Sequence, residues 1–138
     1  METNYRSLNY FFDDVLQDLP CQSDTKAYIT GIFSKYKDPS FDLSKDSVTI
    51  IYAQARDKQD FSQFQNLGDW IFFSKTFVPG VLHGASDEYY RTVGRMSYYT
   101  CYRMINRQWK LFEEMADNFI VLERATKKLL SKNLNVHV

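Results

Sequence analysis

The sequence predicts an all-α protein, a compact bundle of five to six helices with a long C-terminal helix. Apolar residues recur at three- and four-residue steps along most of the chain, which is the helical period. Only three prolines and five glycines interrupt 138 residues. With no linker-like stretch, we expect one domain over residues 1–138, with a frayed tail at 133–138. Aromatic residues form 17% of the chain and should dominate its core.

The first half of the chain predicts three helices. Residues 7–19 carry an apolar stripe that Pro20 ends, and Ser23 is a good cap for a second helix. Residues 47–51 are β-branched and fit a strand, but residues 47–55 also fit a helix capped by Asp46 or Ser47. We favour the helix, because a strand without a partner would leave its backbone groups unpaired.

The segment from Asp60 to Val78 is apolar on nearly every side, which is typical of a central helix. We therefore expect it to be the most buried helix of the protein, capped by Asp60. Gly68 in its middle costs about 1 kcal/mol relative to alanine. That cost is offset if a neighbouring helix approaches closely at the missing side chain.

After the loop around Gly84, Ser86 followed by two acids predicts another helix start. A heptad-like seam then continues to the end of the chain. Its positions are Gly94, Tyr98, Cys101, Ile105, Gln108, Phe112, Met115, Phe119, Leu122, Thr126 and Leu129. Either one helix covers residues 88–132, or two helices meet near residues 106–108, where the seam is polar. We favour one long helix with a bend.

Composition and motifs exclude several classes of function. Seventeen basic residues balance seventeen acidic ones, so no general attraction to nucleic acid or anionic membranes is expected. No apolar run could span a bilayer, and the N-terminus lacks the pattern of a secretory signal. Cys21 and Cys101 are expected to be reduced thiols in a cytoplasmic protein. Only His83 and His137 are available as imidazole ligands, and no nucleotide-binding motif occurs, so we expect no metal and no cofactor.

Arginines and tyrosines alternate after Ser86 and form a candidate interaction surface. Its members are Tyr90, Arg91, Arg95, Tyr99, Arg103 and Arg107. These residue types are enriched at protein interfaces, and they also suit stacking on nucleic-acid bases. Alternatively, the arginines pair internally with carboxylates and the tyrosines are half-buried.

Asp69 lies inside the apolar helix, and a buried carboxylate needs a partner. We predict that Asp69 forms a buried pair with Arg91 or Arg95, and we favour Arg95 as the partner. A different hypothesis is a ligand pocket or small active site. Its candidate residues are Trp70, Ser74, His83, Tyr90 and Tyr98, with Asp69 and Arg95 as further polar groups.

Two stretches, LGDWIFFSKTFVP and EYYRTVGRMSYY, resemble a pattern in small helical bacterial proteins of unknown function. The matching positions are Gly68, Asp69, Phe73, Ser74, Phe77, Tyr89, Tyr90, Gly94 and Tyr98, and YITGIFSKY extends the likeness to about half the chain. The resemblance implies a helical fold and supplies no catalytic residue.

The sequence thus favours a non-enzymatic interaction protein that self-associates or binds a protein partner through its Arg/Tyr surface. A small enzyme or ligand-binding protein with an aromatic-lined pocket is the first alternative. A nucleic-acid-binding protein is the second.

Overall fold

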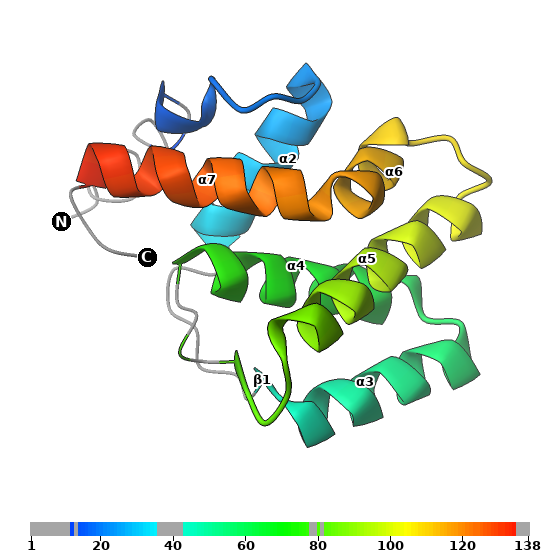
Figure 1. Cartoon of the computed structure of the whole chain (residues 1–138). Helices are drawn as coiled ribbons and strands as arrows, with labels where there is room; N and C mark the ends of the chain where they lie inside the picture. Colours follow the sequence, from blue (N-terminus) through cyan, green and yellow to red (C-terminus); the bar gives the residue numbers. More distant parts are fainter. Residues whose placement is uncertain (1–11, 13, 36–42, 78–79, 81, 135–138) are drawn as a thin grey trace, which may run out of the picture.

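The structure is a computed structural model, and it describes every residue except 1–11, 13, 36–42, 78–79, 81 and 135–138 (Figure 1). Its helices are α2 (Ser23–Lys35), α3 (Lys45–Lys58), α4 (Phe61–Phe77), α5 (Asp87–Met104), α6 (Lys110–Asp117) and α7 (Phe119–Leu134). Residues 12 and 14–16 are also helical; the rest of the helix expected over 7–19 is turn or lies outside the described residues. The described part of the chain is helical apart from one short strand pair, as predicted, but it has seven helices rather than five or six.

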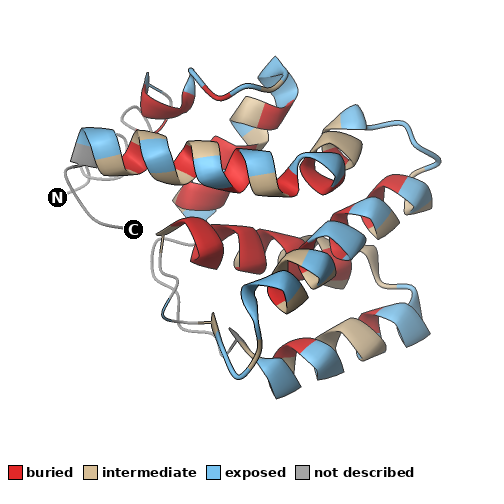
Figure 2. Ribbon diagram, in the orientation of Figure 1, coloured by how far each residue is buried: buried red, intermediate tan, exposed pale blue. Residues whose placement is uncertain are grey.

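Helix α4 lies at the centre and packs against α2, α3, α5 and α7 (Figures 1 and 2). It carries more buried residues than any other helix with described bounds, and Leu67, Ile71 and Phe72 are fully buried. The prediction of a central, most buried helix is confirmed. Fully buried aromatic rings fill the space around α4, as the high aromatic content predicts.

Two glycines allow the central helices to approach each other closely. A Cβ atom at Gly68 would lie 2.9 Å from ring atoms of Tyr98 on α5. A Cβ atom at Gly94 on α5 would lie 2.9 Å from ring atoms of Phe119 on α7. Each glycine therefore accommodates an aromatic ring that any side chain would displace, as expected for Gly68.

Side-chain oxygens accept first-turn amides at three helix starts. The pairs are Ser44 with the Ser47 amide, Asp60 with the Gln63 amide, and Ser86 with the Tyr89 amide. Residues 47–55 are helical as favoured, but α3 begins at Lys45, so its cap is Ser44 rather than Asp46 or Ser47. The two residues before α3 form β1 (Leu43–Ser44), which pairs in parallel with β2 (Leu82–His83). This short pair joins the loops that precede α3 and α5.

The prediction of one helix over residues 88–132 is wrong. Residues Asn106 and Arg107 have left-handed backbone angles, with φ of 55° and 59°, and they separate α5 from α6. A second break at Asn118 separates α6 from α7. The first break falls where the seam is polar and where Gln108 is exposed, which was the alternative considered. Folding the segment back there lets α6 and α7 both cover the α4–α5 core (Figure 1).

Candidate functional site

A buried carboxylate lies between three helices. Asp69 on α4 is only 3% exposed, and the hydroxyls of Tyr28 on α2 and Tyr98 on α5 both donate hydrogen bonds to its Oδ1 atom. Each of the two O–O distances is 2.7 Å. The side-chain amide of Gln65 donates to the Tyr28 hydroxyl at 3.1 Å, which orients that hydroxyl toward Asp69.

The predicted pair between Asp69 and an arginine is wrong, although Asp69 is buried as expected. Arg95 is exposed and donates from Nε to the backbone oxygen of Ala116 at 3.0 Å, in the last turn of α6. A guanidinium is favourable there because the carbonyls of a final helical turn lack helical partners. Two phenols satisfy Asp69 instead, and they do so without bringing a second charge into the core.

Burial controls the protonation of the groups around this carboxylate. It raises the pKa of Asp69 to about 6, although the hydrogen bonds from Tyr98 and Tyr28 lower it. Burial, together with the nearby Asp69 charge, raises the pKa values of the Tyr28 and Tyr98 hydroxyls well above their ordinary range. The same two causes raise the pKa of the Cys101 thiol to about 12. Asp69 is thus the group of this cluster that changes charge near neutral pH.

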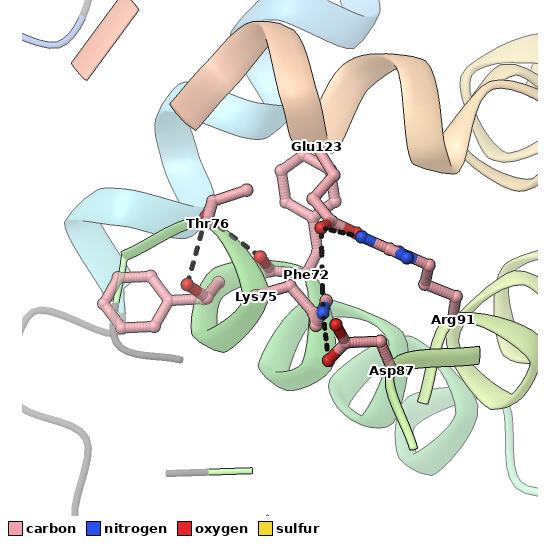
Figure 3. A network of polar contacts seen from close by, with 7 residues as sticks. Phe72, Lys75, Thr76, Asp87, Arg91 and Glu123 are labelled. Atoms are coloured by element: carbon pink, nitrogen blue, oxygen red, sulfur yellow. Dashed lines mark hydrogen bonds and ion pairs between the residues drawn. The ribbon is translucent and has the colours of Figure 1, made fainter. Parts of the chain in front are cut away.

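A second buried carboxylate belongs to an ion cluster that joins α4, α5 and α7 (Figure 3). Glu123 is fully buried, and Arg91 binds both of its oxygens, at 3.0 and 2.8 Å. Lys75, itself 4% exposed, lies 3.8 Å from the same carboxylate and 2.7 Å from Asp87. Because these charges are mutually paired, we assign this cluster to helix packing rather than to ligand binding.

The structure divides the predicted Arg/Tyr surface. Tyr90 is buried with its hydroxyl on the His83 carbonyl, and Arg91 is committed to Glu123. Both therefore have internal partners, as in the alternative of internal pairing. Tyr99 is 43% exposed, and Arg95, Arg103 and Arg107 are also exposed. The remaining exposed members lie on α5 and on the turn that follows it, and Figure 2 shows exposed positions along α5.

Two hollows flank the exposed side of α5. The smaller has a volume of about 260 Å³ and is lined by Thr92, Arg95, Met96, Tyr99, Ala116 and Asp117. The larger, of about 470 Å³, lies between α5, α3 and the start of α4, and its lining includes Arg56, Met96, Tyr99 and Arg103. Met96, which is 49% exposed, and Tyr99 line both hollows and so form the ridge between them. We call the exposed residues Arg56, Arg95, Met96, Tyr99 and Arg103 the α5 face.

None of the hollows described among the placed residues is lined by Trp70, Ser74, His83 or Tyr98, the residues of the predicted pocket. Ser74 and Tyr98 are completely buried, Trp70 is partly buried on α4, and His83 is exposed on β2. None of these four lines either hollow along α5. Ser74 and Tyr98 pack into the α4 core, whereas one hollow opens between α5 and α6 and the other between α5, α3 and the start of α4.

Sequence reasoning missed Tyr28 as the partner of Asp69, and it missed Glu123, Arg56 and Met96. Glu123 has a recognisable signal, since it lies four residues after Phe119 and three before Thr126, both on the buried seam. Tyr28 lies on α2, and nothing in its spacing indicates a carboxylate 41 residues away. Arg56 comes to the α5 face only through the packing of α3.

Within the described part of the chain, no group of three or more His, Cys, Asp or Glu side chains is placed to hold a metal ion. No helix among the described residues has the length and apolar character needed to cross a membrane. In comparisons with protein-family models, curated proteins and solved structures, nothing matches this chain. The class that its fold and sites define is therefore an all-helical protein with a buried Asp–Tyr cluster and a basic, partly apolar helical face.

Proposed function

We propose that this compact helical bundle is a cytoplasmic, non-enzymatic protein-binding module, and that its α5 face binds an acidic segment of a partner protein. The observation that carries the proposal is the exposure of Met96 and Tyr99 between two hollows, with arginines on either side. Large apolar side chains grouped at the surface mark interaction sites more often than scattered ones do. Met, Tyr and Arg are also the types enriched where proteins bind each other.

The charge of the face supports an acidic partner. Three arginines line the two hollows, and Asp117 is the one carboxylate residue among the described lining residues. Among the described residues, neither Arg56 nor Arg103 forms an ion pair through its side chain. A guanidinium group without an ion pair can donate two parallel N–H hydrogen bonds to a carboxylate of the partner protein. An aspartate- or glutamate-rich segment with an aromatic or branched side chain satisfies both the arginines and the hollows.

The same charges argue against pairing of two copies through this face. A two-fold dimer would place the face against itself, and would bring its arginines near their own symmetry mates. Like charges facing each other across an interface cost free energy. Self-association through the α5 face is therefore the less favoured arrangement, and light scattering at several salt concentrations tests it directly.

Nucleic acid is the second candidate for the face, because arginine and tyrosine can hold phosphates and stack on bases. The formal net charge of zero disfavours it, since nucleic-acid binding draws most of its affinity from an excess of cations. Titration with single-stranded DNA at rising salt separates the two candidates. Tight binding that weakens steeply with salt would favour nucleic acid over protein.

The proposal is tested by selecting peptides from an unbiased display library on the intact protein. We expect enrichment of acidic peptides with an apolar anchor. Their affinity should fall at least about tenfold in Tyr99→Ala and in Arg103→Ala, the loss typical of an interface hot spot. Val121→Ala is the matched control, because Val121 is 55% exposed on α7, away from both hollows.

Two results would overturn the proposal. One is a set of selected peptides without an excess of acidic residues. The other is peptide binding that both α5-face variants retain unchanged.

A further inference from the structure

A third hollow lies on other elements, between α2 and α4, where the buried carboxylate Asp69 forms part of its wall. Its volume is about 260 Å³. The lining residues besides Lys35 are Ala27, Tyr28, Gly31, Ile32, Gln65 and Asp69. This volume is below the roughly 300–1,000 Å³ of sites for drug-sized ligands, so it suits a small metabolite.

The hydrogen bonding of Asp69 is one-sided. Both tyrosine hydroxyls donate to Oδ1, and no described residue donates a hydrogen bond to Oδ2. Oδ2 is not among the buried side-chain oxygens that lack a partner, so it keeps access to the hollow that Asp69 lines, where a small molecule can donate to it. An asparagine at this position would still accept from both phenols, without placing a charge in the core. The packing of the two phenols therefore requires an acceptor here but not a charge, whereas a ligand that donates to Oδ2 accounts for the charge.

The rest of the hollow indicates what such a ligand looks like. Ala27 and Ile32 provide an apolar wall on α2, and the space beside Gly31 is open, with no atom within 4 Å of the place a Cβ would occupy. Lys35 lines the same hollow, and its Nζ atom donates to the Asn66 side chain at 3.1 Å. The hollow thus combines a carboxylate, an ammonium group and an apolar surface.

We propose that the α2–α4 hollow binds a small zwitterion of the α-amino acid type. The ammonium group of the ligand donates to Asp69 Oδ2, its carboxylate faces Lys35, and its side chain packs on Ala27 and Ile32. A simple cation is disfavoured because Lys35 would repel it, and a simple anion because Asp69 would repel it. Gly31 leaves the room that the ligand side chain occupies.

The pH dependence of binding follows from the groups around the carboxylate. Tyr28 and Lys35 from α2, and Tyr98 and Cys101 from α5, are the titratable groups that act on Asp69. Asp69 has a pKa of about 6 and loses its charge below that pH. Affinity for the ammonium group should therefore decline as the pH falls through 6, while an amine-free ligand would show no such loss.

The probes are the common α-amino acids, together with propylamine and propionate, which carry only one of the two charges. Binding to the intact protein is measured by calorimetry and by shifts in two-dimensional NMR spectra. We expect at least one apolar amino acid to bind with a dissociation constant of about 1 mM or lower, and each single-charge probe to bind at least about tenfold more weakly.

Three variants and one control test the location. Asp69→Asn removes the charge, and Gly31→Leu fills the open space from an exposed helical position, so both should lose binding at least about tenfold. Lys35→Met should weaken the binding of the amino acid but not the binding of propylamine. Lys26→Met is its matched control on the same helix, because Lys26 lines a different hollow, and it should bind like the wild type. Thermal unfolding of each variant confirms that it is folded.

The proposal is overturned if no amino acid binds the wild-type protein at about 10 mM. It is equally overturned if folded Gly31→Leu binds as tightly as the wild type. Binding of propylamine as strong as that of the amino acids would also overturn it, since the site would then recognise a cation alone. None of these outcomes depends on the α5 face, so the two proposals fail separately.

Discussion

At the scale of single residues, Asp69 and the two contact glycines account for most of what is unusual in this core. Asp69 carries a charge that its surroundings only partly solvate, with a pKa raised from 3.8 to about 6. Because the folded pKa lies above the unfolded one, its contribution to stability is fully present below pH 3.8. That contribution is lost as the pH rises to about 6, and above pH 6 the ionised group disfavours folding.

Asp69→Asn should therefore stabilise the protein at pH 7, by up to about 3 kcal/mol, because the amide keeps an acceptor for both phenols without the charge. The gain should shrink as the pH falls from 6 toward 4. Urea denaturation at several pH values measures it. The exposed Asp57→Asn is the control and should keep the pH profile of the wild type. A wild-type stability that does not change between pH 4 and 6 would contradict the assignment.

Alanine substitutions at three glycines can be compared with one another. Gly68→Ala places a Cβ against Tyr98, and Gly94→Ala places one against Phe119; both rings are fully buried and cannot easily move. Each should cost about 1–3 kcal/mol through overpacking. Gly31→Ala meets no atom within 4 Å, and should stabilise by about 0.5–1 kcal/mol through helix propensity. Equal changes in unfolding free energy for the three substitutions, measured by denaturant titration, would show that the rings do not approach Gly68 and Gly94 so closely.

At the scale of elements, the ion cluster around Glu123 fastens α7 to α4 and α5. Glu123→Ala leaves the buried Lys75 and the partly buried Arg91 without a carboxylate in the core, and should cost about 3–5 kcal/mol. Asp87→Ala removes the 72% exposed end of the same cluster, and should cost less than about 1 kcal/mol. Unfolding free energies of the two variants decide this. Similar losses of unfolding free energy in the two variants would mean that the buried Glu123 carboxylate stabilises the protein no more than the exposed Asp87 does.

The turn between α5 and α6 depends on two left-handed residues, Asn106 and Arg107. Arginine is strained in that conformation, and glycine is not. Arg107→Gly should therefore leave the stability unchanged or raise it by up to about 1 kcal/mol. Arg103→Gly, in the regular helix α5, should cost about 1 kcal/mol. If Arg107→Gly were as damaging as Arg103→Gly, the segment would be a continuous helix in solution.

The elements also show where sequence reasoning succeeds and where it ends. Periodicity identified α2, α4 and the start of α5, because the apolar stripes and capping residues of those helices are local signals. It failed at the α5–α6 turn, because the seam continues on both sides and neither Asn106 nor Arg107 is a residue type that demands a turn. Local pattern cannot distinguish a seam along one helix from a seam that folds back on itself.

Contacts between helices are the other feature that could not be predicted from the sequence. The burial of Asp69 was predictable from its apolar neighbours, but its partners were not. Tyr98 and Arg95 lie one turn apart on α5, and only the rotation of that helix decides which of them faces α4. The same rotation buries Tyr98 and exposes Tyr99. It also turns two of the six residues of the predicted Arg/Tyr surface, Tyr90 and Arg91, toward internal partners.

At the scale of the whole molecule, α4 is shared by the helices that pack around it, so we expect one cooperative unfolding transition. Two tryptophans can report on it: Trp70 is partly buried on α4, and Trp109 is 57% exposed before α6. Fluorescence of Trp70→Phe and Trp109→Phe should give transitions that coincide with the loss of circular dichroism within each variant. Separate midpoints for the two probes would mean that α6 and its surroundings unfold independently.

Cys101 lies on α5 at the contact with α4, fully buried, with its Sγ atom 3.9 Å from the Phe61 carbonyl oxygen. A thiol with a pKa of about 12 and no access to solvent reacts with alkylating reagents only when the surrounding helices open. Cys21 is partly exposed, and its pKa of about 11 keeps it slow but reachable. The ratio of their labelling rates therefore measures, without any added probe, how often the α4–α5 contact opens in the native protein.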